Sequence, residues 1–176
     1  MTHEAVVWAA GLFDGEGCVA VERLTPRRLS GERTTKYRLR VRVRMTHRRT
    51  IERLQEIFGF GSMQFQSNKY NPKAADSYVW ALQGANANAF LLAVRQHVFT
   101  KKEEVDLAVE FYEWNASVRP VGQGGTKAAV LDKRERYYER IRDLKSSNKT
   151  RGQVPRERDR KQAAGFDVAD LAEVFE

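Results

Sequence analysis

Two carboxylates stand close together near the beginning of this 176-residue chain, in the segment from Trp8 to Gly17, which reads W-A-A-G-L-F-D-G-E-G. The small and apolar residues of this segment predict a helix, so Asp14 and Glu16 would lie at its C-terminal end, where negative charge opposes the helix dipole. Two explanations stay open for acids in this place: a capping role or a bound divalent cation. Mg²⁺ takes carboxylate and carbonyl oxygens and keeps waters, so one or two acids would suffice if substrate phosphates supplied the other ligands.

The same predicted helix carries two glycines one turn apart, Gly11 and Gly15. They leave one stripe without side chains, which would let a second helix approach until the two backbones touch. Apolar residues cover most of the remaining circumference, so we expect this helix to be packed between other elements.

A row of arginines is the second chemical feature, in the segment 37–46, which reads Y-R-L-R-V-R-V-R-M-T. Successive side chains of a strand point to opposite faces, so Arg38, Arg40, Arg42 and Arg44 would share one face, with no inward acids to offset them. Guanidinium groups match the acceptors of guanine and of phosphate, so this face predicts contact with DNA or RNA. The plainer alternative is a solvated or edge-protecting strand face.

The composition also favours a polyanionic partner. Lys and Arg number 31 against 23 acids, which gives a formal charge of +8 and a pI near 9.8. Nucleic acid is the first candidate and an anionic membrane the second. No apolar run is long enough to span a bilayer and no secretion signal is visible, so we expect a soluble intracellular protein. A single cysteine, Cys18, excludes an internal disulfide and a cysteine-clustered zinc site.

Hydrophobic periodicity indicates how these residues are positioned. Alternation predicts strands over 18–24, 37–46, 61–66 and 77–83, and helical spacing predicts further helices over 48–58, from about 86, over 100–115 and over 130–144. Thr46 or Thr50 would cap the helix over 48–58, and Phe65 would point inward. Outward amides at Gln64 and Gln66 could bind adenine or simply stay solvated.

The letters A-G-L-F-D-G-E-G resemble the signature of the LAGLIDADG homing endonucleases. Ala9 stands where the family has its opening Leu, and Glu16 replaces the usual final Asp but keeps the carboxylate. The resemblance implies an α+β fold of order αββαββα, in which a four-stranded antiparallel, saddle-shaped sheet holds DNA on its concave face. The helices after about residue 116 would be additions at the C-terminal end.

The resemblance also implies site residues. Glu16 and the carbonyl of Gly15 would hold the metal ions, Lys101 best matches a basic residue of the family near the active site, and His47 would organise solvent or act as a base. We expect DNA contacts from groove-side residues of the four strands, namely Glu22, Arg38, Arg40, Arg42, Arg44, Gln64, Gln66 and Ser77.

The first functional hypothesis is an intron-encoded, single-motif, homodimeric endonuclease that cuts both strands of a long pseudo-palindromic DNA target. It would depend on Mg²⁺ or another divalent cation such as Mn²⁺, with Ca²⁺ as a non-cleaving substitute. One motif per chain requires two chains, and the interface would include Ala10, Gly11, Asp14 and Gly15. Asp14 would also cap or brace structure. The compartment would be the cytoplasm or nucleoid of a prokaryote or phage-infected cell, or an organelle.

The second hypothesis is a binding module on the same fold: an RNA-binding intron-splicing maturase or a cleavage-deficient DNA-binding regulator. The carboxylate of Glu16 argues for a nuclease, because it would repel phosphate in a protein that only binds.

Two segments of different composition follow from the sequence. An endonuclease domain over 1–146 would have a core over 1–116 and a helical extension over 117–146. Residues 147–176 would form a basic tail that ends in an acidic amphipathic segment, Phe166 to Phe175. A basic loop over 25–35 would touch a phosphate backbone or stay solvated, and neither alternative is favoured.

Overall fold

The computed structural model of the chain describes residues 1–24, 35–68, 75–118 and 128–151. Its elements are α1 (His3–Glu16), β1 (Gly17–Leu24), β2 (Lys36–Met45), α2 (Arg48–Phe58), β3 (Ser62–Gln66), β4 (Ser77–Gln83), α3 (Gly84–Val94), α4 (Lys102–Ser117) and α5 (Ala128–Arg151). The chain divides into two compact units, Met1–Lys145 and Ser146–Glu176. The segment Phe166 to Phe175, most of the tail and most of the basic loop lie outside the described residues.

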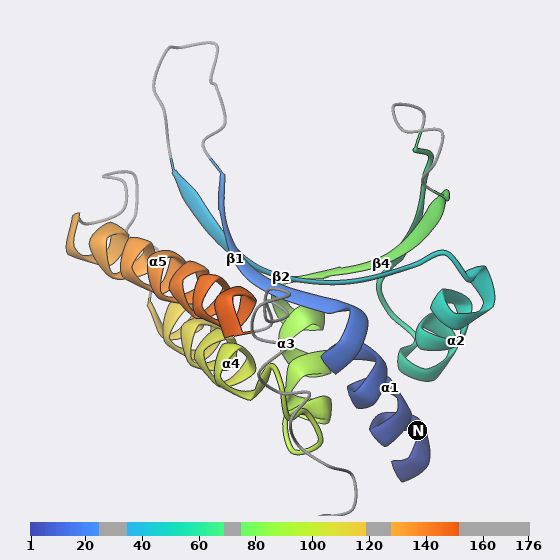
Figure 1. Cartoon of the computed structure of the whole chain (residues 1–176). Helices are drawn as coiled ribbons and strands as arrows, with labels where there is room; N and C mark the ends of the chain where they lie inside the picture. The colour runs from blue at the N-terminus through green and yellow to red at the C-terminus, as the bar shows by residue number, and fades with distance from the viewer. Residues whose placement is uncertain (25–34, 69–74, 119–127, 152–176) are drawn as a thin grey trace, which may run out of the picture. The chain divides into compact units, whose positions relative to one another are not determined.

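The four strands form one antiparallel sheet in the order β1-β2-β4-β3. The sheet is curved, and the helices of the first unit lie on its convex side, so its concave face is left open (Figure 1). The predicted order αββαββα is confirmed, and α4 and α5 are the additional helices.

Alternation along the strands builds the core beneath the sheet. Leu39, Val41 and Val43 of β2 are buried on the helix side, where Trp80 and Leu82 of β4 join them. The helices contribute a matching set of buried side chains, which includes Ala9, Ala10 and Phe13 of α1, Ile51 and Leu54 of α2, and Phe90 and Leu91 of α3. This packing fixes which face of β2 is open, because a shift of one residue would bury its arginines.

Several element boundaries differ from the predicted ones. α3 begins at Gly84, before the predicted residue 86, because its φ of +54° lets the chain turn directly from β4 into the helix. The N-cap of α2 is His47 and neither Thr46 nor Thr50. α5 is longer than the predicted 130–144 at both ends. Its middle is held by Tyr137 and Ile141, which are buried, and Tyr137 packs on Phe111 of α4.

Phe65 is also less covered than the alternation predicts. It lies on the helix side, opposite Tyr78, with ring centroids 5.4 Å apart. It is nevertheless 58% exposed, because β3 is an edge strand and Phe65 is near its end. None of the described helices is long and apolar enough to cross a membrane.

Candidate active site and nucleic-acid interface

The end of α1 is joined directly to the sheet. α1 ends at Glu16 and β1 begins at Gly17, so no linking residue separates helix and strand. Gly17 is required by close packing, because a Cβ at this position would overlap the ring and the carbonyl of Phe13. Phe13 is fully buried and packs edge-on against Phe90, so the ring cannot move aside. The backbone that carries Glu16 is therefore held by the core on one side and by the sheet on the other.

Asp14 is fully engaged within the protomer. Its Oδ2 accepts hydrogen bonds from the backbone N–H groups of Phe99 at 3.0 Å and Thr100 at 2.8 Å, and its Oδ1 accepts one from Lys101 at 2.8 Å. Partial burial raises the pKa of the Asp14 carboxyl, but these N–H groups outweigh it and hold that pKa below its ordinary value. Asp14 thus braces the end of α1 against the turn before α4.

The carboxylate of Glu16, unlike that of Asp14, is not held by any other residue that the structure describes. It is exposed, and among the described residues it makes no hydrogen bond or ion pair. It lines a cavity of about 190 Å³ on the concave face together with Cys18, Arg42, Arg44, Gln66 and Val79. An acid that meets two basic side chains in an open cavity can bind a cation or approach a phosphate that those arginines hold.

The chemistry of this donor set fits a divalent cation shared with a substrate. No three His, Cys, Asp or Glu side chains of the described residues gather into a metal cluster, so one protomer offers only the carboxylate of Glu16 and nearby backbone carbonyls such as that of Gly15. Mg²⁺ is commonly bound in this way, through one or two carboxylates, waters and substrate phosphates.

The two other predicted catalytic side chains are placed differently. Lys101 lies at the N-cap of α4, and its Nζ donates a hydrogen bond to the backbone carbonyl of Asp14, two residues before Glu16. His47 is exposed at the start of α2, with its Nδ1 2.9 Å from Oγ1 of Thr50. Neither side chain lines the cavity of Glu16. The structure therefore brings Lys101 to the end of α1, whereas the role of His47 stays a prediction.

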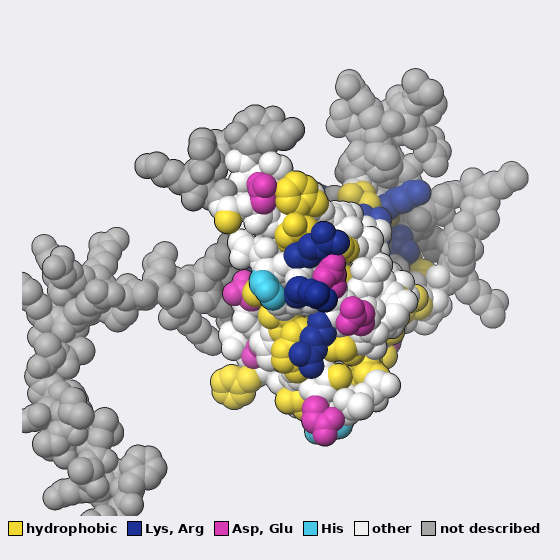
Figure 2. Space-filling model, turned by 90° about the vertical axis from the view of Figure 1, so that its right-hand side faces the viewer, with side chains coloured by type: hydrophobic (Ala, Val, Ile, Leu, Met, Phe, Trp, Pro, Cys, Tyr) yellow, Lys and Arg dark blue, Asp and Glu magenta, His cyan; other side chains and the backbone are white. Residues whose placement is uncertain are grey.

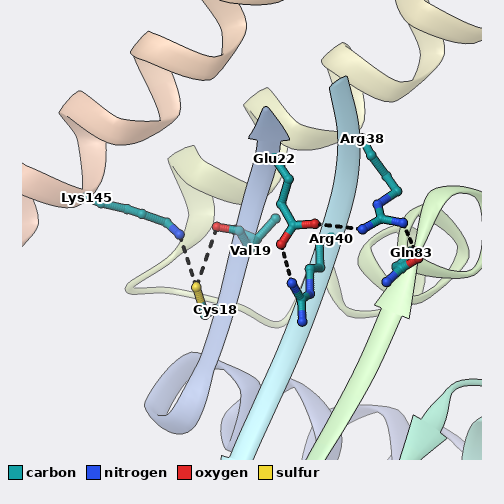
Figure 3. Close-up of polar contacts among 7 residues, drawn as sticks. All are labelled: Cys18, Val19, Glu22, Arg38, Arg40, Gln83 and Lys145. Carbon is teal, nitrogen blue, oxygen red and sulfur yellow. Dashed lines mark hydrogen bonds and ion pairs between the residues drawn. The ribbon is translucent and has the colours of Figure 1, made fainter. Parts of the chain in front are cut away.

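The four arginines of β2 lie on the open face, as the alternation predicts, because the residues between them are buried on the helix side. The expectation that no acid offsets them is wrong, because the antiparallel register places Glu22 of β1 opposite Arg38. Oε2 of Glu22 is 3.0 Å from Nη2 of Arg38, and Oε1 of Glu22 accepts a hydrogen bond from Nη1 of Arg40 (Figure 3). Nη1 of Arg38 also donates to Oε1 of Gln83 at 2.6 Å.

These contacts influence the ionisation of Glu22. Partial burial alone would raise the pKa of its carboxyl, but the hydrogen bonds and charges of Arg40 and Arg38 outweigh burial and lower that pKa. Glu22 is therefore a carboxylate at neutral pH, and it removes one unit of positive charge from this end of the arginine row.

Arg42 and Arg44 form no ion pair among the described residues, although both share a cavity with Glu16. Arg42 has no hydrogen-bond or ion-pair partner within the described part of the chain, and Arg44 donates from Nε to Oγ of Ser77 at 2.7 Å and from Nη2 to Oδ1 of Asn68 at 3.4 Å. Ser77 is only 2% exposed. The covered hydroxyl of Ser77 supports Arg44, and the direct DNA contact expected from Ser77 stays a prediction.

The side chains of Gln64 and Gln66 in β3 lie on the open face of the sheet, as predicted. Gln64 is exposed, and Gln66 is half-buried in the wall of the Glu16 cavity. Both can donate and accept hydrogen bonds at the open face, so both remain candidates for base contact.

Other basic residues of the unit have structural roles. On α2, Arg48 pairs with Glu52 at 2.7 Å and lies over the ring of Tyr78, while Arg53 lies 4.6 Å from the ring centroid of Trp8. The side of the molecule that faces right in Figure 1, where α2 lies, accordingly mixes basic, acidic and apolar side chains (Figure 2). Arg42 and Arg44 differ from these residues, because neither forms an ion pair among the described residues.

The predicted interface residues of α1 divide into two pairs. Gly11 and Gly15 are exposed, and a Cβ built on either would meet nothing within 4 Å. Ala10 is 0% exposed within the protomer, and the carboxylate of Asp14 is engaged by the turn before α4. The side chain of Ala10 is therefore covered by the chain itself, and the assignment of the four residues to a dimer interface stays a prediction. A helix that is apolar nearly all round does not reveal by periodicity which face is already covered.

Sequence reasoning missed a polar cluster that α5 makes with the end of β1. Glu135 accepts hydrogen bonds from Nη1 of Arg23 at 2.6 Å and from the hydroxyl of Tyr37. Burial, followed by the bond to Glu135, raises the pKa of Tyr37 to about 12. Lys145 also reaches Sγ of Cys18 at 3.1 Å (Figure 3). A charged helix face gives no sign of which acid will meet which strand, so the sequence offered no signal here.

Comparisons with known proteins add to this geometry. No protein-family model matches the sequence, and no curated protein matches it either. Solved structures of homing endonucleases are similar to the chain. The homing endonuclease I-CvuI, in complex with its target in the presence of calcium, matches with a TM-score of 0.63 and 15% identity over 79% of this chain and 80% of that one. The archaeal intron-encoded homing endonuclease I-Vdi141I, complexed with DNA, matches with a TM-score of 0.60 and 14% identity over 79% and 82%.

A third is the LAGLIDADG homing endonuclease I-LtrWI bound to target DNA, with a TM-score of 0.55 and 14% identity over 75% of this chain and 42% of that one. Sequence identities this low show similarity of fold only and do not show the activity of this chain. The open antiparallel sheet, the D-G-E-G segment at the junction of α1 and β1, and these similarities lead to one conclusion: this chain has the fold of the LAGLIDADG homing endonucleases.

Proposed function

We propose that this protein is a site-specific endonuclease that binds double-stranded DNA on the concave face and hydrolyses both strands with the help of divalent metal ions. The observation that carries the proposal is the state of Glu16, an exposed carboxylate without a partner in the described structure, set in a cavity beside Arg42 and Arg44. A protein that only binds nucleic acid gains nothing from such an acid, because it repels phosphate.

The residues around Glu16 would divide the work. Arg42 and Arg44 bind phosphate oxygens, Asp14 keeps the end of α1 in place, and Glu16 with the carbonyl of Gly15 would hold Mg²⁺. Bound divalent metal ions supply an activated water and stabilise the leaving 3′ oxygen in phosphodiester hydrolysis. Lys101, anchored on the carbonyl of Asp14, adds positive charge behind the scissile phosphate.

Two copies of the chain would be needed to cut both strands, because each contributes a single Glu16. Gly11 and Gly15 form an exposed stripe without side chains, and Val7, 42% exposed, extends it toward the start of α1. A second α1 can approach closely along such a stripe, which would bring the two Glu16 side chains near a two-fold axis.

Sedimentation tests this dimer. The wild-type chain at micromolar concentration should have the mass of two chains, and Gly11→Leu should have the mass of one, since Leu would push the helices apart. A wild-type mass of one chain without DNA, or a Gly11→Leu variant with the mass and cleavage of the wild type, would refute the interface.

The activity is tested with a randomised library of palindromic duplexes, from which cleaved ends are captured and sequenced. We expect a defined set of cleaved sequences with Mg²⁺ or Mn²⁺, and uncut but bound DNA with Ca²⁺ or after removal of metal by EDTA. Tighter binding of structured RNA than of duplex DNA, with no nicking in Mg²⁺, would instead favour the splicing maturase. Selective binding of DNA without cleavage would favour the regulator.

A further inference from the structure

The four arginines of β2 do not form one uniform surface. Arg38 and Arg40 are joined to each other through the carboxylate of Glu22, and Gln83 holds the second terminal nitrogen of Arg38. Arg42 has no partner among the described residues, and Arg44 is held only by neutral groups. The difference lies in how the acids are used: Glu16 lines the cavity of Arg42 and Arg44 but is bonded to neither, whereas Glu22 is bonded to both Arg38 and Arg40.

A carboxylate in this place weakens attraction to a phosphate backbone, so general affinity for nucleic acid does not explain it. The contacts explain it better as a means of fixing orientation. Glu22 is 19% exposed and bonds one oxygen to each arginine, while the Nε atoms of Arg38 and Arg40 are buried and unpaired within the described structure. Relief of repulsion between two guanidiniums would not require the additional bond from Gln83 to Arg38.

Both held arginines keep hydrogen-bonding capacity toward the groove. Each terminal nitrogen of a guanidinium carries two hydrogens, so Arg38 retains one on each Nη after it has bonded Glu22 and Gln83. A guanidinium with a fixed plane can present two parallel donors to the O6 and N7 atoms of guanine. A guanidinium without such support adjusts to phosphate oxygens on any sequence.

We propose that Glu22 is a specificity-determining positioning residue, which together with Gln83 orients Arg38 and Arg40 for bases and thereby lowers affinity for unrelated DNA. Arg42, which has no partner among the described residues, then supplies a sequence-independent contact to phosphate near Glu16. This inference rests on the proposed binding of duplex DNA, but it requires no cleavage.

Two variants of the 176-residue chain test the role of Glu22. Fluorescence anisotropy measures their affinity for a random-sequence duplex over a range of salt concentrations. Selection of bound duplexes from the randomised library, in Ca²⁺ so that no cleavage occurs, measures their sequence preference. Glu22→Gln removes the charge and frees an arginine for phosphate, so it should bind random duplex more tightly. Its plot of log affinity against log salt should be steeper by about one. Enrichment of the preferred base at the positions contacted should fall about tenfold.

Gln83→Ala separates orientation from charge. It leaves the ion pairs of Glu22 intact and releases only one end of Arg38, so enrichment should fall while the salt dependence keeps the wild-type slope. Gln83 is exposed at the end of β4, so this variant keeps the inference testable even if Glu22→Gln fails to fold.

Glu52→Gln is the matched control, because Glu52 also pairs with an arginine but lies on α2, away from the open face. It changes net charge by the same amount and should leave salt slope and selected sequences unchanged. Equal effects of Glu22→Gln and Glu52→Gln, or undiminished enrichment in both Glu22→Gln and Gln83→Ala, would overturn the inference. A wild-type chain that binds no duplex at all would refute the proposed function first, and with it this assignment.

Discussion

At the end of α1, Asp14 faces the turn before α4, whereas Glu16 faces the cavity on the concave side of the sheet. Asp14 accepts three backbone hydrogen bonds at 2.8 to 3.0 Å, while Glu16 is exposed and has no partner in the described residues. Two acids of one short motif therefore occupy opposite environments. A carboxylate satisfied by the fold stabilises it, and one left unsatisfied at an open cavity is available for chemistry.

The largest expected effect comes from Glu16→Gln. The change keeps the size of the side chain and removes its charge, so cleavage in Mg²⁺ should fall by roughly a thousandfold or more, while DNA affinity is retained. The free energy of unfolding should change by no more than about 0.5 kcal/mol, because nothing in the fold depends on this carboxylate. Single-turnover cleavage, anisotropy and urea unfolding measure the three quantities. Retained cleavage would remove Glu16 from the proposed site.

Lys101→Met should reduce cleavage by roughly a hundredfold, since it removes a positive charge anchored beside the end of α1. Lys102→Met is its control: Nζ of Lys102 pairs with Asp106 at 2.7 Å on α4, and its loss should leave the cleavage rate unchanged. Equal rates for the two variants would show that Lys101 has only a structural role.

Asp14→Ala should lower the free energy of unfolding, because Asp14 has a structural role and not a direct role in cleavage. It leaves the N–H groups of Phe99, Thr100 and Lys101 without their acceptor, and loss of such a cap costs about 1 to 2 kcal/mol. Urea unfolding of Asp14→Ala and Glu16→Ala at neutral pH makes the comparison direct. An Asp14→Ala variant as stable as Glu16→Ala would contradict the difference drawn between the two acids.

The smallest expected effect is a pH dependence of the difference in unfolding free energy between the wild type and Asp14→Ala. Because the pKa of Asp14 is lower in the folded chain than in the unfolded one, its ionised form stabilises the fold above the unfolded-state pKa, and this contribution is lost as pH falls through the lowered pKa. The gap in unfolding free energy between wild type and Asp14→Ala should therefore narrow below about pH 4. A gap that stays constant down to acid pH would show that the charge of Asp14 contributes nothing.

The sequence predicted those features that depend on local periodicity. The strict alternation of β2 identified the arginine face, and the bounds of α2 and β4 agree with the predicted 48–58 and 77–83. The signature around Glu16 led to the fold, which the structural comparisons confirm.

Features that depend on which strand or helix lies alongside could not be predicted in the same way. The pairing of Glu22 with Arg38 and Arg40 follows from strand register, and the meeting of Glu135 with Tyr37 follows from the docking of α5. The rotation of α1 about its axis buries Ala10 and exposes Gly11, although both are small residues in an almost wholly apolar helix. Tertiary packing decides such choices, and a single sequence does not display it.

The direct passage from α1 into β1 has a consequence for how this scaffold could acquire new targets. With no residue between Glu16 and the first residue of the sheet, an insertion there would displace the acid from the concave face that we propose binds DNA. The open-face side chains of β2, β3 and β4 outside the cavity of Glu16 belong to strands other than β1 and not to the hydrophobic core, so they can be exchanged without a change in the backbone that carries Glu16. Substitutions on the open face could therefore change the DNA sequence that the protein binds, while the proposed cleavage site at Glu16 stays the same.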